Sequence, residues 1–102
     1  MRLRLVVIDD EVFVRRGIIS SIDWNAHDIE VVGEAFDGIS GLDIIRTTHP
    51  HIVITDIRMP NMDGLQLIRQ VQEELPGTIF FVLSVLEEFK TVREALQLGV
   101  ID

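Results

Sequence analysis

The 102-residue sequence contains no cysteine, which excludes a disulfide framework and any metal site built on thiolates. It has only 9 Lys and Arg residues against 17 Asp and Glu residues, so its formal net charge is −8. A chain of this charge lacks the clustered cations that bind nucleic acid phosphates or an anionic membrane surface. It also lacks an apolar run of the roughly 18 residues that span a bilayer, and its first residues do not form a signal peptide. These absences fit a protein of the reducing cytoplasm with no membrane partner.

The composition is that of a folded protein, because 47% of the residues are hydrophobic and 25% are charged. At this length we expect one domain with a core of modest size. Residues 1–102 are therefore treated as a single domain.

Short apolar runs alternate with segments of helical periodicity along the chain. The runs predict four strands, and the residues between them recur at helical spacing and predict four helices. Val100, Ile101 and Asp102 follow the last helix, and we interpret them as the start of a fifth strand that the chain does not finish. The predicted strands are 3–8, 29–35, 52–55 and 79–83, and the helices are centred on 12–22, 42–45, 65–75 and 89–96.

Strand–helix repeats of this length predict right-handed βαβ units, and so an α/β fold with a parallel sheet covered on both faces. We expect a flavodoxin-like, doubly wound sheet with the strand order 2-1-3-4-5, its fifth strand incomplete. In that order the first and third strands are neighbours, and ligands bind beyond the carboxyl ends of the strands where the order reverses.

Acidic residues stand at these strand ends. Asp9 and Asp10 follow the first predicted strand and Asp56 follows the third, so we expect their carboxylates to converge. Three close carboxylates repel one another unless a cation or protons lie among them, and an all-oxygen site suits Mg²⁺. A carboxylate beside Mg²⁺ can attack a phosphoryl group as a nucleophile. Ser84, after the fourth strand, could donate its hydroxyl to a phosphoryl oxygen.

Each of these residues also has a structural interpretation. Asp9 and Asp10 suit caps of the first helix, and Asp56 suits a turn before a loop rich in Pro and Gly. Ser84 and Glu87 have the spacing of a capping box. The joint placement of the acids and the hydroxyl on one rim of the sheet favours the chemical interpretation.

Other polar residues are given no chemical role. Asp37 precedes a glycine and is interpreted as a turn residue. Arg15 and Arg16 are interpreted as part of a solvated helix face.

The sequence resembles the receiver domain of two-component response regulators, and the likeness runs across all 102 residues. Some segments resemble more narrowly the regulators that carry a C-terminal AraC-type helix-turn-helix DNA-binding domain: 23–24, 32–35 and 54–60. The receiver likeness itself is carried by 7–11, 55–60, 62–64, Ser84 and 94–99.

The resemblance implies a phosphorylation-dependent signalling switch rather than an enzyme. Asp56 would accept a phosphoryl group from the phosphohistidine of a sensor histidine kinase. Asp10 would bind Mg²⁺ directly together with Asp56, Asp9 would bind it through water, and the backbone carbonyl of Arg58 would add a ligand. Ser84 would contact the phosphoryl group and move on activation. The output, transcriptional control, would lie in a C-terminal domain absent from this sequence, and DNA would be contacted only there.

Two departures from the family pattern stand out. The chain ends at Asp102, before the lysine that the family places at the end of the fifth strand, and Val85 follows Ser84 where a small residue is usual. Without the last strand and helix, an edge of the sheet and an apolar face would be uncovered. We therefore expect that the sequence is incomplete or that it forms a homodimer. A stable dilute monomer in size-exclusion chromatography with light scattering would contradict this expectation.

Two other functions compete with the switch. A Mg²⁺-dependent phosphohydrolase with an aspartyl nucleophile would need a second carboxylate as general acid two residues after the nucleophile. This chain has Arg58 at that position. A receiver-like interaction module that is never phosphorylated remains open, because the lysine is missing and Val85 is large.

Overall fold

Four parallel strands form one sheet in the order β2-β1-β3-β4. The computed structural model describes residues 2–83. In this part of the chain, β1 is the first strand in sequence but lies inside the sheet, between β2 and β3. The strands are β1 (Leu3–Ile8), β2 (Ile29–Ala35), β3 (Ile52–Asp56) and β4 (Ile79–Leu83).

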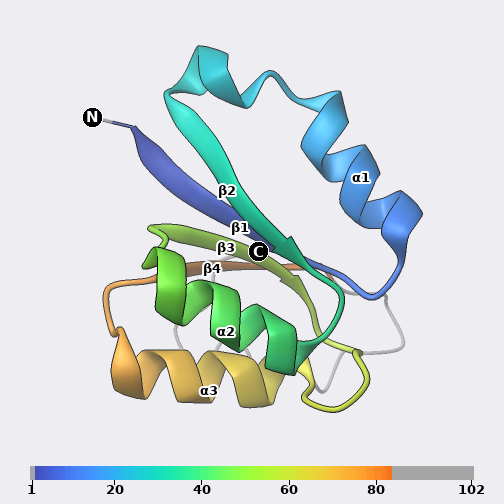
Figure 1. The fold of residues 1–102 in the computed structure, drawn as a ribbon, viewed down its shortest axis with the longest axis vertical. Coiled ribbons are helices and arrows are strands. Elements are labelled where there is room, and N and C mark those ends of the chain that lie inside the picture. Colours follow the sequence, from blue (N-terminus) through green and yellow to red (C-terminus); the bar gives the residue numbers. More distant parts are fainter. Residues whose placement is uncertain (1, 84–102) are drawn as a thin grey trace.

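Helices cover both faces of this sheet (Figure 1). Helix α1 (Val12–Ser21) lies over one face, and α2 (Gly38–Thr48) and α3 (Gly64–Glu74) lie side by side over the other. A short 3-10 helix, η1 (Trp24–His27), precedes β2. The arrangement is the doubly wound α/β architecture expected from the alternation of strands and helices.

The four predicted strands, the first three predicted helices and the order 2-1-3-4 are confirmed. One boundary was predicted wrongly, because Asp56 was assigned to the loop and is the last residue of β3. The predicted fourth helix, the start of a fifth strand, Ser84 and Val85 lie outside the described residues. The expected homodimer depends on that part of the chain and stays a prediction.

The core lies between the sheet and helices α2 and α3. Its side chains come from all four strands and from the inward faces of the two helices, where apolar residues recur at helical spacing. The buried members are Val6, Ile8, Ala35, Leu42, Ile45, Val53, Ile57, Leu65, Leu67, Ile68, Val71, Phe80 and Val82. This packing fixes β1 and β3 beside each other and so fixes the relative position of the residues that follow them.

The opposite face of the sheet is packed differently. None of the residues of α1 is fully buried, and the Phe13 side chain is 88% exposed. In residues 2–83 no helix has the length and hydropathy of a membrane span.

Candidate metal centre

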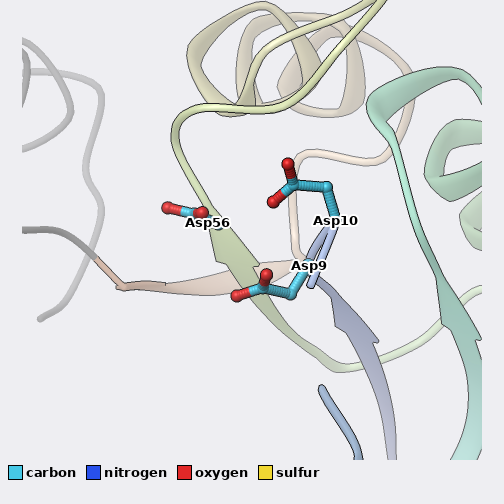
Figure 2. Close-up of side chains that lie close together, drawn as sticks. All are labelled: Asp9, Asp10 and Asp56. Atoms are coloured by element: carbon cyan, nitrogen blue, oxygen red, sulfur yellow. The ribbon is translucent and has the colours of Figure 1, made fainter. Parts of the chain in front are cut away.

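Three carboxylates from two neighbouring strands meet at the carboxyl edge of the sheet. Asp9 and Asp10 directly follow β1, and Asp56 ends β3. The two strands pair in register, so that Ile8 lies opposite Thr55 and the acids that follow lie at the same level. One carboxylate oxygen from each aspartate lies within 4.8 Å of the others. Figure 2 shows the three side chains turned toward one region between the strand ends.

The three side chains differ in burial. Asp9 is buried, Asp56 is half-buried and Asp10 is exposed. Asp9 Oδ1 accepts a hydrogen bond of 2.9 Å from the Glu11 backbone N–H, and Asp56 Oδ1 accepts one of 2.7 Å from the Ile57 backbone N–H. A carboxylate has about four acceptor positions, so both groups retain capacity for another ligand.

Burial and mutual repulsion disfavour the charged form of this cluster. Burial raises the pKa of Asp56, and the charges of Asp9 and Asp10 raise it further, against the Ile57 hydrogen bond. Burial also raises the pKa of Asp9, with further contributions from the charges of Asp10 and Glu11. A cation among the three carboxylates would relieve both effects.

The donor set fits Mg²⁺. All three side chains offer oxygen, the ligand atom that Mg²⁺ prefers, and one oxygen of each lies within 4.8 Å of the others. Mg²⁺ characteristically takes one or two carboxylates and keeps several waters, which suits a site that has one exposed member.

The structure does not support the interpretation of Asp9 and Asp10 as caps of the first helix. The N-cap of α1 is Glu11, and its side chain makes no capping hydrogen bond. The Asp9 carboxylate bonds the N–H of this N-cap residue, rather than a free N–H of the first helical turn.

The loop after Asp56 turns back onto the carboxyl end of β3 at Gly64. The Gly64 N–H donates a 2.7 Å hydrogen bond to the Ile57 carbonyl, and a Cβ on Gly64 would lie 2.4 Å from the Asp56 carbonyl oxygen. Asp63 and Gln66 form a capping box at the start of α3. The first turn of α3 therefore packs directly against the backbone of Asp56.

The same loop is tied to α2 through Asp37. Asp37 Oδ1 accepts hydrogen bonds of 2.7 Å from both the backbone N–H and the hydroxyl of Ser40, and its Oδ2 accepts one of 2.9 Å from Asn61 Nδ2. The Ser40 bonds lower the pKa of Asp37, and the Asn61 bond adds to this effect. Asp37 is thus a helix cap that also anchors the loop, in a position outside the carboxylate cluster.

We expect the stability of the metal-free protein to respond to pH with opposite signs at Asp9 and Asp37. The pKa of Asp9 is raised above 3.8 by folding, so its ionisation destabilises the fold at neutral pH and not below pH 3.8. The pKa of Asp37 is lowered below 3.8, so its charge stabilises the fold above that pH, and the effect is lost as the pH falls through the lowered pKa.

Asp9→Asn should therefore raise the free energy of unfolding at pH 7 in EDTA, and Asp37→Asn should lower it. The gain from Asp9→Asn should shrink as the pH falls towards about 4, whereas the loss from Asp37→Asn should persist to about that pH and shrink only below it. Urea unfolding from about pH 2.5 to pH 8 measures both differences, and adding MgCl₂ should reduce the gain from Asp9→Asn. Equal shifts of the same sign in the two variants would contradict the assignment.

Arg15 belongs to this neighbourhood, although the sequence interpretation placed it on a solvated helix face. That interpretation is wrong for Arg15, whose side chain is only 13% exposed, and is confirmed for Arg16, which is 67% exposed. Arg15 Nη1 donates to the Asp9 carbonyl oxygen at 2.8 Å, and its Nε donates to Glu34 Oε1 at 2.6 Å. No local signal reveals this, since Glu34 lies on β2 and meets Arg15 only in the folded sheet.

The predicted site residues are brought together in part. Asp9, Asp10 and Asp56 converge, and Arg58 follows in the loop after β3 with an exposed side chain. Ser84 lies outside the described residues.

Comparison with known proteins gives one consistent family. Residues 5–102 match the family described as response regulator receiver domain. The chain is 38% identical over 97 residues to the uncharacterized transcriptional regulatory protein YesN of Bacillus subtilis. The aligned residues make up 95% of this chain and 26% of YesN. The chain is 37% identical over 101 residues to protein-glutamate methylesterase/protein-glutamine glutaminase 2 of Nitratidesulfovibrio vulgaris, covering 98% of the chain and 27% of that protein. The chain thus spans about a quarter of the length of these relatives.

Solved structures agree. The REC domain of AraT, a response regulator from Geobacillus stearothermophilus, matches with a TM-score of 0.95 and 38% identity, over 100% of this chain and 79% of that one. The response regulator domain of Thermotoga maritima CheB matches with a TM-score of 0.83 and 30% identity, over 100% of this chain and 76% of that one.

Proposed function

The chain belongs to the response regulator receiver domain family, and we propose that it is a switch that accepts a phosphoryl group on Asp56 from a sensor histidine kinase. The observation that carries this proposal is the convergence of Asp9, Asp10 and Asp56 within 4.8 Å at the carboxyl ends of β1 and β3. A receiver domain acts as a phosphoacceptor rather than as an enzyme with its own substrate. We place its action in the cytoplasm, beside the kinase.

We assign the three aspartates the roles that the family resemblance implies. Asp10, which is exposed, would bind Mg²⁺ directly together with Asp56, and Asp9, which is buried and accepts a hydrogen bond from the Glu11 N–H, would bind it through water. The backbone carbonyl of Arg58 would complete the protein ligands. When bound, Mg²⁺ would offset the negative charge that the carboxylates and the incoming phosphoryl group bring together.

The reaction is a phosphoryl transfer from nitrogen to oxygen. A carboxylate oxygen of Asp56 attacks phosphorus, an O–P bond forms, and the P–N bond of the phosphohistidine breaks with its electron pair left on the imidazole nitrogen. The hydrogen bond from the Ile57 N–H to Asp56 Oδ1 holds the carboxylate in a fixed orientation. Ser84 would then contact the phosphoryl oxygens and bias a two-state rearrangement near β4.

Incubation with acetyl phosphate and MgCl₂, followed by intact mass and peptide mapping, tests this proposal. We expect one phosphoryl group per chain, located on Asp56 and dependent on Mg²⁺. Absence of the adduct would favour an interaction module that is never phosphorylated. Continuous release of phosphate over many turnovers would favour a phosphohydrolase.

We further propose that the output is transcriptional and is carried by a C-terminal AraC-type DNA-binding domain. The support is the narrower resemblance of 23–24, 32–35 and 54–60, together with the likeness to a protein named as a transcriptional regulator. The methylesterase relatives show that receiver domains of similar sequence occur in proteins with another output. Sequencing the gene beyond codon 102 tests the proposal: a helix-turn-helix segment supports it, and a methylesterase domain or a stop codon contradicts it.

A further inference from the structure

We propose that Arg15 is a positioning residue for the metal site, which holds the backbone of Asp9 so that the carboxylates after β1 face Asp56. The inference rests on the proposed function, because it concerns the affinity of that same site for Mg²⁺. Arg15 itself would not touch the metal or the phosphoryl group.

Two anchors fix the Arg15 guanidinium between α1 and the sheet. Its Nε donates to Glu34 Oε1 of β2 at 2.6 Å, and its Nη1 donates to the Asp9 carbonyl oxygen at 2.8 Å. The side chain is only 13% exposed, so water competes little for either bond. A planar guanidinium presents its donors at fixed angles, so the contact with Glu34 also determines where Nη1 points.

The Asp9 backbone is thereby held at both of its polar groups. Its N–H donates to the Ala35 carbonyl of β2 at 3.1 Å, and its carbonyl accepts from Arg15. The carbonyl of Asp9 belongs to the peptide unit that leads into Asp10. Because Asp10 is exposed, its direction depends on that peptide plane, which Arg15 holds in place.

Whether removal of Arg15 strengthens or weakens Mg²⁺ binding distinguishes a positioning role from a purely electrostatic one. A cation beside three carboxylates repels Mg²⁺, so removing the positive charge alone would strengthen Mg²⁺ binding. The carboxylate of Glu34 offsets the positive charge of Arg15. The main effect of Arg15 on Mg²⁺ affinity is therefore its hydrogen bond to the Asp9 carbonyl. If Arg15 positions the ligands, its removal weakens Mg²⁺ binding in spite of the lost repulsion.

Arg16 provides a matched control on the same helix. Its Nε lies 3.5 Å from the same Glu34 Oε1, but its side chain is 67% exposed. Arg16→Ala removes the same charge beside the same partner while the bond from Arg15 to Asp9 stays in place.

The experiment is a titration of the 102-residue chain with MgCl₂, without phosphodonor, followed by the amide NMR shifts of residues beside the cluster. We expect Arg15→Ala to weaken Mg²⁺ binding about tenfold, the lower end of the range for residues that orient metal ligands. Arg16→Ala should change the affinity by less than about twofold, because its charge is exposed and screened. Arg15→Lys and Glu34→Gln should give intermediate losses, because each keeps only part of the two-anchor arrangement.

Unchanged or tighter binding by Arg15→Ala would overturn the inference, and so would an equal loss in Arg16→Ala. If Arg15→Ala loses the dispersed amide spectrum of a folded chain, Arg15→Lys and Glu34→Gln decide, and wild-type affinity in both would overturn it. If the wild-type chain shows no shift with MgCl₂, the proposed metal site fails and the inference fails with it. If the wild-type chain binds Mg²⁺ and Arg15→Ala binds it with the same affinity, only the inference about Arg15 fails and the proposed metal site stands.

Discussion

Asp56→Asn is expected to abolish the phosphoryl adduct formed with acetyl phosphate and MgCl₂. The amide of Asn has no anionic oxygen to attack phosphorus, but it keeps the shape of Asp and can still accept the 2.7 Å hydrogen bond from the Ile57 N–H. The variant should also fold well, because burial and neighbouring charges raise the pKa of Asp56 and disfavour the ion that the substitution removes. Intact mass spectrometry measures the adduct.

Asp43→Asn is the matched control for this prediction. Asp43 is exposed on α2, so the same chemical change there alters the net charge equally without touching the cluster. The control should be phosphorylated like the wild type. An adduct of undiminished yield in Asp56→Asn would mean that another group is the acceptor and would contradict the assignment of Asp56.

Gly64→Ala is expected to lower the free energy of unfolding by about 3 kcal/mol, a large share of the stability of a domain of this size. A Cβ at this position would lie 2.4 Å from the Asp56 carbonyl oxygen and 2.8 Å from the Ile57 Cα. Both are backbone atoms, so no side-chain rotation can relieve the overlap. The loop would have to move, and the acceptor carboxylate with it, so acetyl phosphate should also react more slowly.

Gly17→Ala controls for the general effect of replacing glycine. Nothing lies within 4 Å of a Cβ on Gly17, which is exposed in α1, so this variant should gain about 0.5–1 kcal/mol from the better helix propensity of Ala. Urea unfolding of both variants measures the difference. Similar losses in the two variants would contradict the close contact between α3 and the Asp56 backbone.

The elements were predictable because each has a local cause. The β-branched runs of β1 and β3 suit strands buried in a sheet, and apolar residues at helical spacing suit α2 and α3. Strand–helix alternation leaves few topologies other than a parallel sheet, and a flavodoxin-like strand order in that sheet places Asp9, Asp10 and Asp56 at one edge. The position of Asp56 was predicted less well, because the end of a strand depends on pairing with its neighbours rather than on its own residue type.

By itself, the sequence determined the strands and three of the helices, because hydrophobic periodicity acts over short distances along the polypeptide. The strand order, and with it the meeting of the three acids, was predicted by assuming a flavodoxin-like sheet, and the pairing of β1 with β3 confirms it. Only the tertiary structure decided the surroundings of those acids. Arg15 is anchored on Glu34 of β2, Asn61 is bonded to Asp37 ahead of α2, and Gly64 packs against the backbone of Asp56. These contacts join segments that are separate in the chain, and their geometry follows from how the helices pack on the sheet. For this reason the adjacent residues Arg15 and Arg16 lie in different environments, one largely buried and one exposed.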